Sequence, residues 1–143
     1  MNLEQRIGGV LPPSFSSLGQ KEQQYFLDLE QYQAPWLSEK LVQEKEVESQ
    51  EDYEQRFREL KKYVALLKIS QEPLGMVSTK VDNLWHQFIL FTKQYHDFSR
   101  QFYGKYIHHQ PNTPLTPLNN QATNNFYHWY HEVYGPLPHI WRE

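Results

Sequence analysis

Apolar residues recur at helical spacing along most of this chain, and no segment alternates apolar and polar residues in the way that is typical of a strand. The clearest pattern lies between residues 50 and 70. Its apolar stripe, at steps of three and four, consists of Tyr53, Phe57, Leu60, Val64 and Leu67. Ser49 and Asp52 stand where a helix entrance is expected. The sequence therefore predicts one long amphipathic helix, which EPLG at residues 72–75 ends.

Shorter patterns predict helices on both sides of this one. Residues 20–33 carry aromatic and apolar side chains near helical spacing, and Pro35 suits the first turn of a second helix. Residues 121–134 form a last helix, which Gly135 is expected to close. The segment QPNTPLTPLNN contains three prolines and is predicted to be a loop. Residues 1–19, with several glycines, prolines and serines, resemble a loose leader.

The segment from residue 80 to residue 104 allows two interpretations. Ser78 or Thr79 caps a helix that either continues as one central helix to Gly104 or ends before Thr92, which would then cap a new helix. Either way, we expect an all-α fold. It is a single-domain helical bundle of about six helices over residues 20–143, with a central helix at about 80–104.

The composition argues against several classes of protein. A chain of 143 residues supports one core, and 15% aromatic residues is too many for a disordered chain. A net charge of -3 gives no reason to expect a nucleic-acid partner. The absence of cysteine excludes disulfides and thiolate metal sites, and the longest apolar runs are too short to span a membrane. We expect a cytoplasmic domain without membrane contact, and the charge run at residues 44–62 on the outer face of a helix.

The stretch VDNLWHQFILFT, residues 81–92, places two ionisable side chains in an apolar segment. Asp82 and His86 are four residues apart and can face each other on a helix. A carboxylate that accepts the Nδ1–H of His86 would leave Nε2 free to bind a ligand. Alternatively, the two groups satisfy each other and pin two helices together. His128 and Glu132 share this spacing, but they are expected to point into solvent.

A second group of histidines follows at His108 and His109. In an extended segment adjacent side chains point to opposite sides, so one of the two can join His86. Asp82, His86 and His109 together would suit Zn²⁺ or a two-histidine, one-carboxylate iron site. The His-Glu-x-x-His signature of metalloproteases is absent. The expected polar cluster consists of Asp82, His86, His96, His108 and His109.

Residues 76–111, MVSTKVDNLWHQFILFTKQYHDFSRQFYGKYIHHQP, resemble the motif region of the glycine-rich domain-containing protein-like family, a largely uncharacterised group. The shared elements are Val81-Asp82, Trp85-His86, Ile89-Leu90, Tyr95, Gly104, His108-His109 and Pro111. The resemblance implies a small helical domain with an Asp–His centre, and it supplies no reaction. Phe88 stands where many members carry a second histidine, and Ser99 stands where several carry cysteine.

These observations lead to two functional hypotheses. The first is a non-catalytic binding or interaction module, with a protein partner, whose buried polar cluster holds Asp82, His86 and His109. The second is a metal-dependent enzyme, with Zn or non-haem Fe, in which His86 and His109 are ligands and Asp82 is a ligand or orients one. An enzyme needs an open coordination position and a substrate-sized pocket. The substrate and the oligomeric state do not follow from the sequence.

Overall fold

The computed structural model describes residues 9–109 and 120–142, and every regular element in this part of the chain is a helix. The expected all-α class is therefore confirmed, with a number of helices close to six. The α-helices are α2 (Gln20–Gln31), α3 (Pro35–Gln43), α4 (Gln50–Ser70), α5 (Thr79–Leu90), α6 (Thr92–Tyr103) and α7 (Asn120–Tyr134). The described residues also form two short 3-10 helices, η1 (Phe15–Ser17) and η2 (His139–Trp141).

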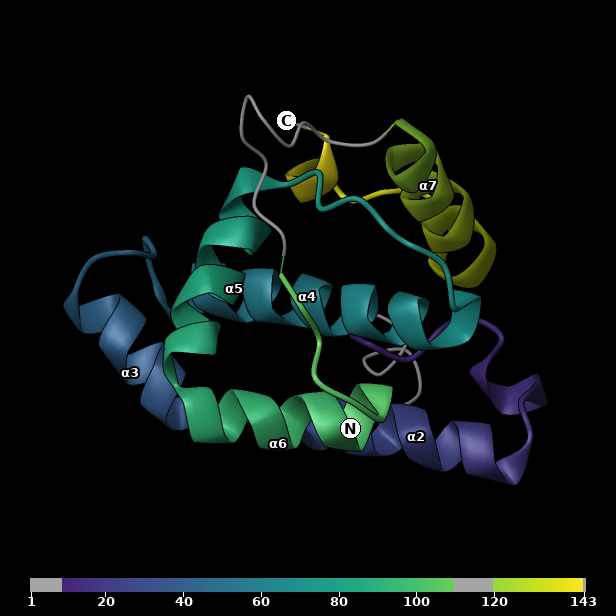
Figure 1. Ribbon diagram of the computed structural model, residues 1–143, viewed down its shortest axis with the longest axis horizontal. Coiled ribbons are helices and arrows are strands. Elements are labelled where there is room, and N and C mark those ends of the chain that lie inside the picture. Colours follow the sequence, from purple (N-terminus) through teal and green to yellow (C-terminus); the bar gives the residue numbers. More distant parts are fainter. Residues whose placement is uncertain (1–8, 110–119, 143) are drawn as a thin grey trace.

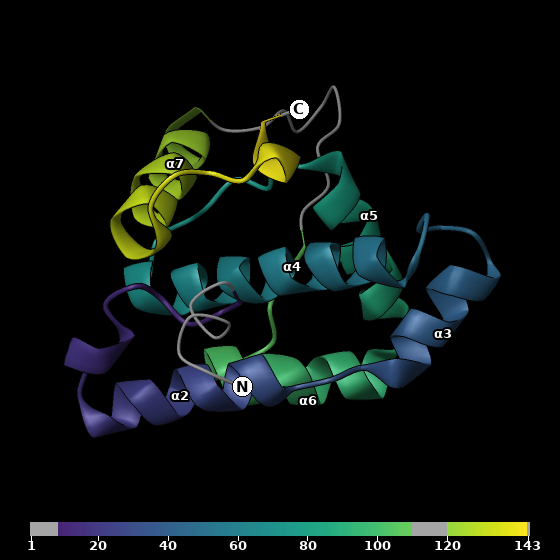
Figure 2. The same ribbon diagram turned by 180° about the vertical axis from the view of Figure 1, so that it is seen from behind.

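Helix α4 lies at the centre of the molecule and contacts α3, α5, α6 and α7 (Figure 1). Helices α2 and α6 lie side by side along one side of it in both views (Figures 1 and 2), and the Tyr25 hydroxyl of α2 donates to the Phe102 carbonyl of α6. Helix α7 lies on the opposite side of α4. None of the described helices is long and apolar enough to cross a membrane.

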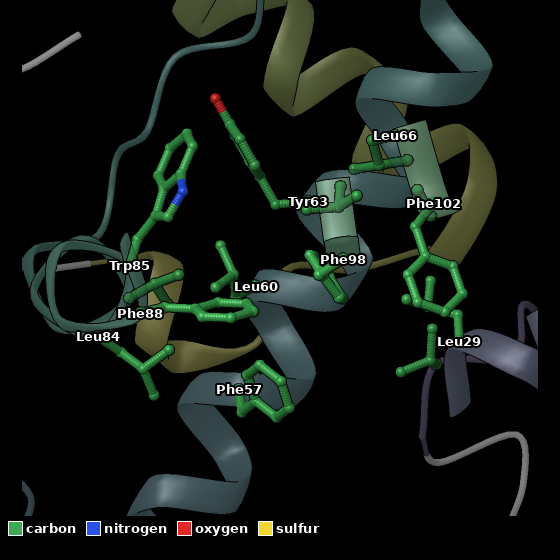
Figure 3. Close-up of a cluster of buried hydrophobic side chains, with 14 of the residues drawn as sticks. Leu29, Phe57, Leu60, Tyr63, Leu66, Leu84, Trp85, Phe88, Phe98 and Phe102 are labelled. Atoms are coloured by element: carbon green, nitrogen blue, oxygen red, sulfur yellow. The ribbon is translucent and has the colours of Figure 1, made fainter. Parts of the chain in front are cut away.

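The sequence explains where α4 begins and what it buries. The Ser49 side chain accepts a hydrogen bond from the Asp52 amide, as expected for an N-cap. The stripe predicted for this helix faces the core, with Phe57, Leu60 and Val64 at most 5% exposed. Figure 3 shows Phe57, Leu60 and Tyr63 of α4 among side chains from α5 and α6. The aromatic-rich stripe thus organises the hydrophobic core.

The charge run at residues 44–62 does not lie wholly on an outer face, and that prediction is wrong. Four of its charged residues are buried: Arg56, Glu59, Lys61 and Lys62. Their burial follows from the central place of α4: Glu59 and Lys62 contact α7, Lys61 donates to carbonyls at the end of α2, and Arg56 donates to the Glu46 carbonyl after α3. The buried carboxylate of Glu59 accepts hydrogen bonds from the Tyr130 hydroxyl (2.6 Å) and the Trp141 indole (2.8 Å), and Lys62 lies 3.1 Å away.

Of the two alternatives for residues 80–104, two separate helices are confirmed and the single central helix is wrong, because the chain turns at Phe91. Phe91 leaves the helical conformation, with φ -85° and ψ 72°, and no side chain caps α6, so Thr92 is its first residue rather than its cap. The Phe91 ring packs on Trp36 at 4.7 Å between centroids. The turn lets Phe88 of α5 and Phe98 of α6 reach the same core, which one straight helix could not do.

Other predicted boundaries are confirmed or corrected at particular residues. Gly104 and Gly135 end α6 and α7 with φ of 91° and 92°, a region that glycine adopts without strain. The loose leader predicted for residues 1–19 does not include Val10 and Leu11, which are 1% and 0% exposed. The Val10 amide donates to Glu30 at 2.7 Å. Residues 110–119 of the predicted QPNTPLTPLNN loop lie outside the described residues.

Candidate functional site

Helix α5 supplies two of the predicted site residues. It begins after Ser78, whose hydroxyl accepts a hydrogen bond from the Val81 amide. Val81, Leu84, Trp85 and Phe88 face the core. Asp82 and His86, at the spacing of one helical turn, therefore share the edge of α5 beside the inward face, with side chains 29% and 46% exposed.

The third residue comes from the segment that follows α6. Residues 105–109 have no regular secondary structure, and Figure 1 shows the chain returning from the end of α6 past α4 toward α5. Along this segment Ile107 is buried, His108 is exposed and the His109 side chain is only 7% exposed. The alternation expected for adjacent histidines places His109, rather than His108, against α5.

Asp82, His86 and His109 meet at this point. The His109 Nε2 lies 2.6 Å from Asp82 Oδ1, and the His86 Nε2 lies 3.9 Å from Asp82 Oδ2. The two imidazole rings are 4.3 Å apart between centroids. One donor atom from each residue lies within 4.8 Å of the other two. The three residues selected from the sequence thus form one compact group of two nitrogens and one oxygen.

The geometry differs from the expected one in two respects. Asp82 forms its short contact with His109, not with His86, and the atom of His86 that faces Asp82 is Nε2 rather than Nδ1. The cluster is also not buried as a whole, since the His86 side chain is nearly half exposed. Only His109 is enclosed, so the group is open to solvent on the His86 side.

His96 and His108 lie beside the Tyr106 ring, with centroid distances of 6.4 Å and 5.0 Å. Neither belongs to the group of donors that lie within reach of one metal ion. His128 and Glu132 are exposed on α7, as expected. The two departures from the family pattern, Phe88 and Ser99, are both 0% exposed and belong to the core.

Two aromatic residues of the core lie next to the three donors. The Trp85 ring meets the His109 ring edge to face at 4.4 Å between centroids, and Tyr63 lies 5.4 Å from Trp85. Burial, and then the negative charge of Asp82, raise the pKa of Tyr63 well above its usual value. The side of the site next to Trp85 is therefore apolar, and the side next to His86 is exposed to solvent.

A larger groove lies elsewhere on the molecule. It has a volume of about 860 Å³ and runs between α3, α4 and the residues that join α2 to α3, with Tyr53, Phe57 and Lys61 among its lining. Burial lowers the pKa of Lys61 to about 8. Lys61 donates to the carbonyls of Glu30 and Tyr32, so it closes the end of α2. None of Asp82, His86 and His109 lines this groove.

The sequence pointed to the three residues that meet here, but not to the buried hydrogen bonds beside them. The Trp85 indole donates to the Tyr95 hydroxyl at 2.9 Å, and this hydroxyl donates to the Ile107 carbonyl at 2.6 Å. From the sequence alone, Tyr95 was only one of the residues shared with the motif region, and no role was expected for it. The signal available in the sequence was a tyrosine among phenylalanines, since a buried tyrosine hydroxyl usually finds a partner.

Comparison with known proteins gives a family but no function. No curated protein and no solved structure matches the chain. The UCP032817-like family, which is uncharacterised, matches residues 22–133 and so includes all three donors. An uncharacterised family agrees with the expectation from the motif region, whereas nothing in the match shows the glycine-rich domain-containing name. The chain belongs to the UCP032817-like family.

Proposed function

We propose that this protein is a small metal-binding domain, in which Asp82, His86 and His109 bind one divalent ion such as Zn²⁺ or Fe²⁺. The observation that carries the proposal is that the three donor atoms lie within 4.8 Å of one another. Two imidazoles and one carboxylate are a ligand set that both ions accept. The two histidines come from separate segments, so the ion would join α5 to the segment after α6.

The distances support this ligand set. Ligand atoms about 2.1 Å from a tetrahedral Zn²⁺ lie about 3.4 Å from each other. The observed separations fall on either side of that value, at 2.6 Å from His109 Nε2 to Asp82 Oδ1 and 3.9 Å from His86 Nε2 to the other oxygen, Oδ2. Binding would move Asp82 and His109 slightly apart and bring His86 closer, and His86 is exposed enough to rotate.

The same geometry leaves at least one coordination position for water, because the His86 side of the group faces solvent. Three protein ligands and a water are the arrangement of catalytic zinc sites. The large groove, however, is lined by other residues. We therefore propose only that the protein binds a metal. A metal-dependent reaction and a protein partner both stay hypotheses.

A second candidate function is favoured by the 2.6 Å contact between His109 and Asp82. In this alternative the two residues form a hydrogen-bonded clasp between α5 and residues 105–109, without a metal ion, and serve a non-catalytic interaction domain. The two candidates differ in what His86 does. In the metal-binding candidate His86 is a ligand of the ion. In the clasp it has no role and is only a neighbour of the other two residues.

Elemental analysis distinguishes the candidates. The purified protein is incubated with Zn²⁺, freed of excess ion, and compared with the variants His86→Ala and His96→Ala. The two histidines are matched, since their side chains are 46% and 51% exposed and both lie on helices. We expect stoichiometric zinc in the native protein and in His96→Ala, and its loss in His86→Ala.

Absence of bound metal from the native protein, or an equal loss in His96→Ala, would contradict the metal proposal. The clasp hypothesis makes a separate prediction, which is tested on protein freed of metal with a chelator. His109→Ala should lower the free energy of unfolding by about 1–3 kcal/mol, because the Asp82 carboxylate loses its partner. His86→Ala should change it by less than about 0.5 kcal/mol.

A further inference from the structure

The hydroxyl of Tyr95 joins the two segments that supply the metal-binding donors. It accepts a hydrogen bond from the Trp85 indole of α5 and donates one to the Ile107 carbonyl, at 2.9 Å and 2.6 Å. Tyr95 itself belongs to α6 and is 1% exposed. All three partners are buried, so neither bond competes with bulk water.

Each of these bonds holds a residue that lies one or two positions before a donor in the chain. Trp85 directly precedes His86 in α5, and its ring contacts the His109 ring at 4.4 Å between centroids. Ile107 precedes His109 by two residues, and both point inward. The hydroxyl therefore fixes the distance between α5 and the segment that carries His109, although it touches none of the three donors.

We propose that Tyr95 is a positioning residue, whose hydroxyl holds His109 beside Asp82 and His86, where all three can reach one metal ion. The expected effect on metal affinity rests on the proposed metal-binding function. The expected effect on the position of His109 rests only on the hydrogen bonds of Tyr95. Without the hydroxyl, the Trp85 N–H and the Ile107 carbonyl lose their shared partner, and the segment after α6 is free to shift relative to α5.

The chain contains a matched control at Tyr130. Its hydroxyl also bridges two buried groups, since it accepts from Lys62 at 3.2 Å and donates to Glu59 at 2.6 Å, and Tyr130 is 1% exposed like Tyr95. It belongs to α7 and contacts none of the donor residues in these bonds. Tyr95→Phe and Tyr130→Phe thus remove the same group from equally buried positions.

The first measurement uses the metal-loaded state, with Co²⁺ as a spectroscopic probe. We expect Tyr95→Phe to bind Co²⁺ about 10–100-fold more weakly than the native protein, as is typical when a residue that orients a ligand is removed. Its visible absorption bands should also change, because they depend on the arrangement of the ligands. Tyr130→Phe should match the native protein in affinity and spectrum, even if its melting temperature falls.

The second measurement uses the metal-free protein and does not depend on the proposed function. The proton between His109 Nε2 and Asp82 should give a protected imidazole signal by NMR in the native protein and in Tyr130→Phe. We expect this signal to be lost or exchange-broadened in Tyr95→Phe.

The two measurements separate the possible failures. If the native protein binds no Co²⁺ but Tyr95→Phe still loses the His109 signal, the positioning role stands and metal binding is wrong. If the native protein binds Co²⁺ and Tyr95→Phe matches it in affinity, spectrum and His109 signal, the metal site stands and the positioning role is wrong. Equal effects of Tyr95→Phe and Tyr130→Phe on the site would also overturn the proposal, since both would then act through general destabilisation.

Discussion

At the scale of single residues, the least exposed charged side chain that the structure describes belongs to Glu59. Its carboxylate accepts from Tyr130 and Trp141 and lies beside Lys62. A buried charge costs several kcal/mol unless it is paired and hydrogen-bonded. These partners offset that cost. Tyr130 belongs to α7 and Trp141 to the C-terminal η2, so one carboxylate of α4 ties three elements together.

Replacing Glu59 should therefore be costly. Glu59→Ala leaves the Lys62 ammonium without its buried partner and removes the acceptor of Tyr130 and Trp141, which should lower the free energy of unfolding by about 3–5 kcal/mol. Urea denaturation followed by circular dichroism measures the change. Glu54→Ala, an exposed position on the same helix, should alter stability by less than about 0.5 kcal/mol. Similar values for the two variants would show that the buried network contributes little.

At the scale of elements, α4 depends on a defined start at Ser49. The Ser49 hydroxyl accepts from the Asp52 amide at 3.1 Å, and the Asp52 carboxylate accepts from the Glu48 amide at 2.9 Å. The first bond satisfies an amide that the first turn leaves without a helical partner, and the second ties the residue before the cap to the helix. Because α4 contacts α3, α5, α6 and α7, fraying of its first turn affects most of the core.

Three substitutions at this cap should form a graded series. Ser49→Ala removes the acceptor and should reduce the free energy of unfolding by about 1 kcal/mol, whereas Ser49→Gly should reduce it by only a few tenths of a kcal/mol. Ser49→Asp restores an acceptor and should match the native protein. Thermal unfolding of the three variants provides the comparison. A loss in Ser49→Asp as large as in Ser49→Ala would mean that the hydroxyl does not act as a cap.

At the scale of the whole molecule, burial of many tyrosines predicts how stability depends on pH. Burial raises the pKa of seven of them: Tyr25, Tyr32, Tyr53, Tyr63, Tyr95, Tyr130 and Tyr134. Above about pH 10 the unfolded chain loses tyrosine protons that the folded chain keeps. Each such tyrosine then lowers the free energy of unfolding by about 1.4 kcal/mol per pH unit.

Lys61 acts in the opposite direction. Burial lowers its pKa to about 8, so between pH 8 and its ordinary value of 10.5 the unfolded chain binds the extra proton and stability rises with pH. One lysine offsets only one of the seven tyrosines, so we expect the melting temperature to fall steeply above about pH 10. Tyrosinate absorbance should appear together with unfolding. Gradual ionisation of most tyrosines near pH 10 in a folded protein would contradict this prediction.

The sequence was sufficient for the parts of the structure that depend on local periodicity. The stripe from Tyr53 to Val64 predicted α4, and the four-residue spacing placed Asp82 and His86 together. The alternation at His108 and His109 indicated that one of these two histidines could join them. It was not sufficient where tertiary contacts decide. Glu59 resembles a solvent-facing residue until α7 covers it, and Phe91 breaks the helix only because Trp36 and the core receive its ring.

The turn at Phe91 also decides whether the three donors can meet at all. A straight helix over residues 79–103 would be about 37 Å long and would carry Gly104 about 33 Å from Asp82. The five residues from Gly104 to His109 reach at most about 17 Å when fully extended. His109 would then remain out of reach of Asp82, 27 residues earlier in the chain. The turn at Phe91 thus lets the chain double back, so that the imidazole of His109 reaches the carboxylate of Asp82.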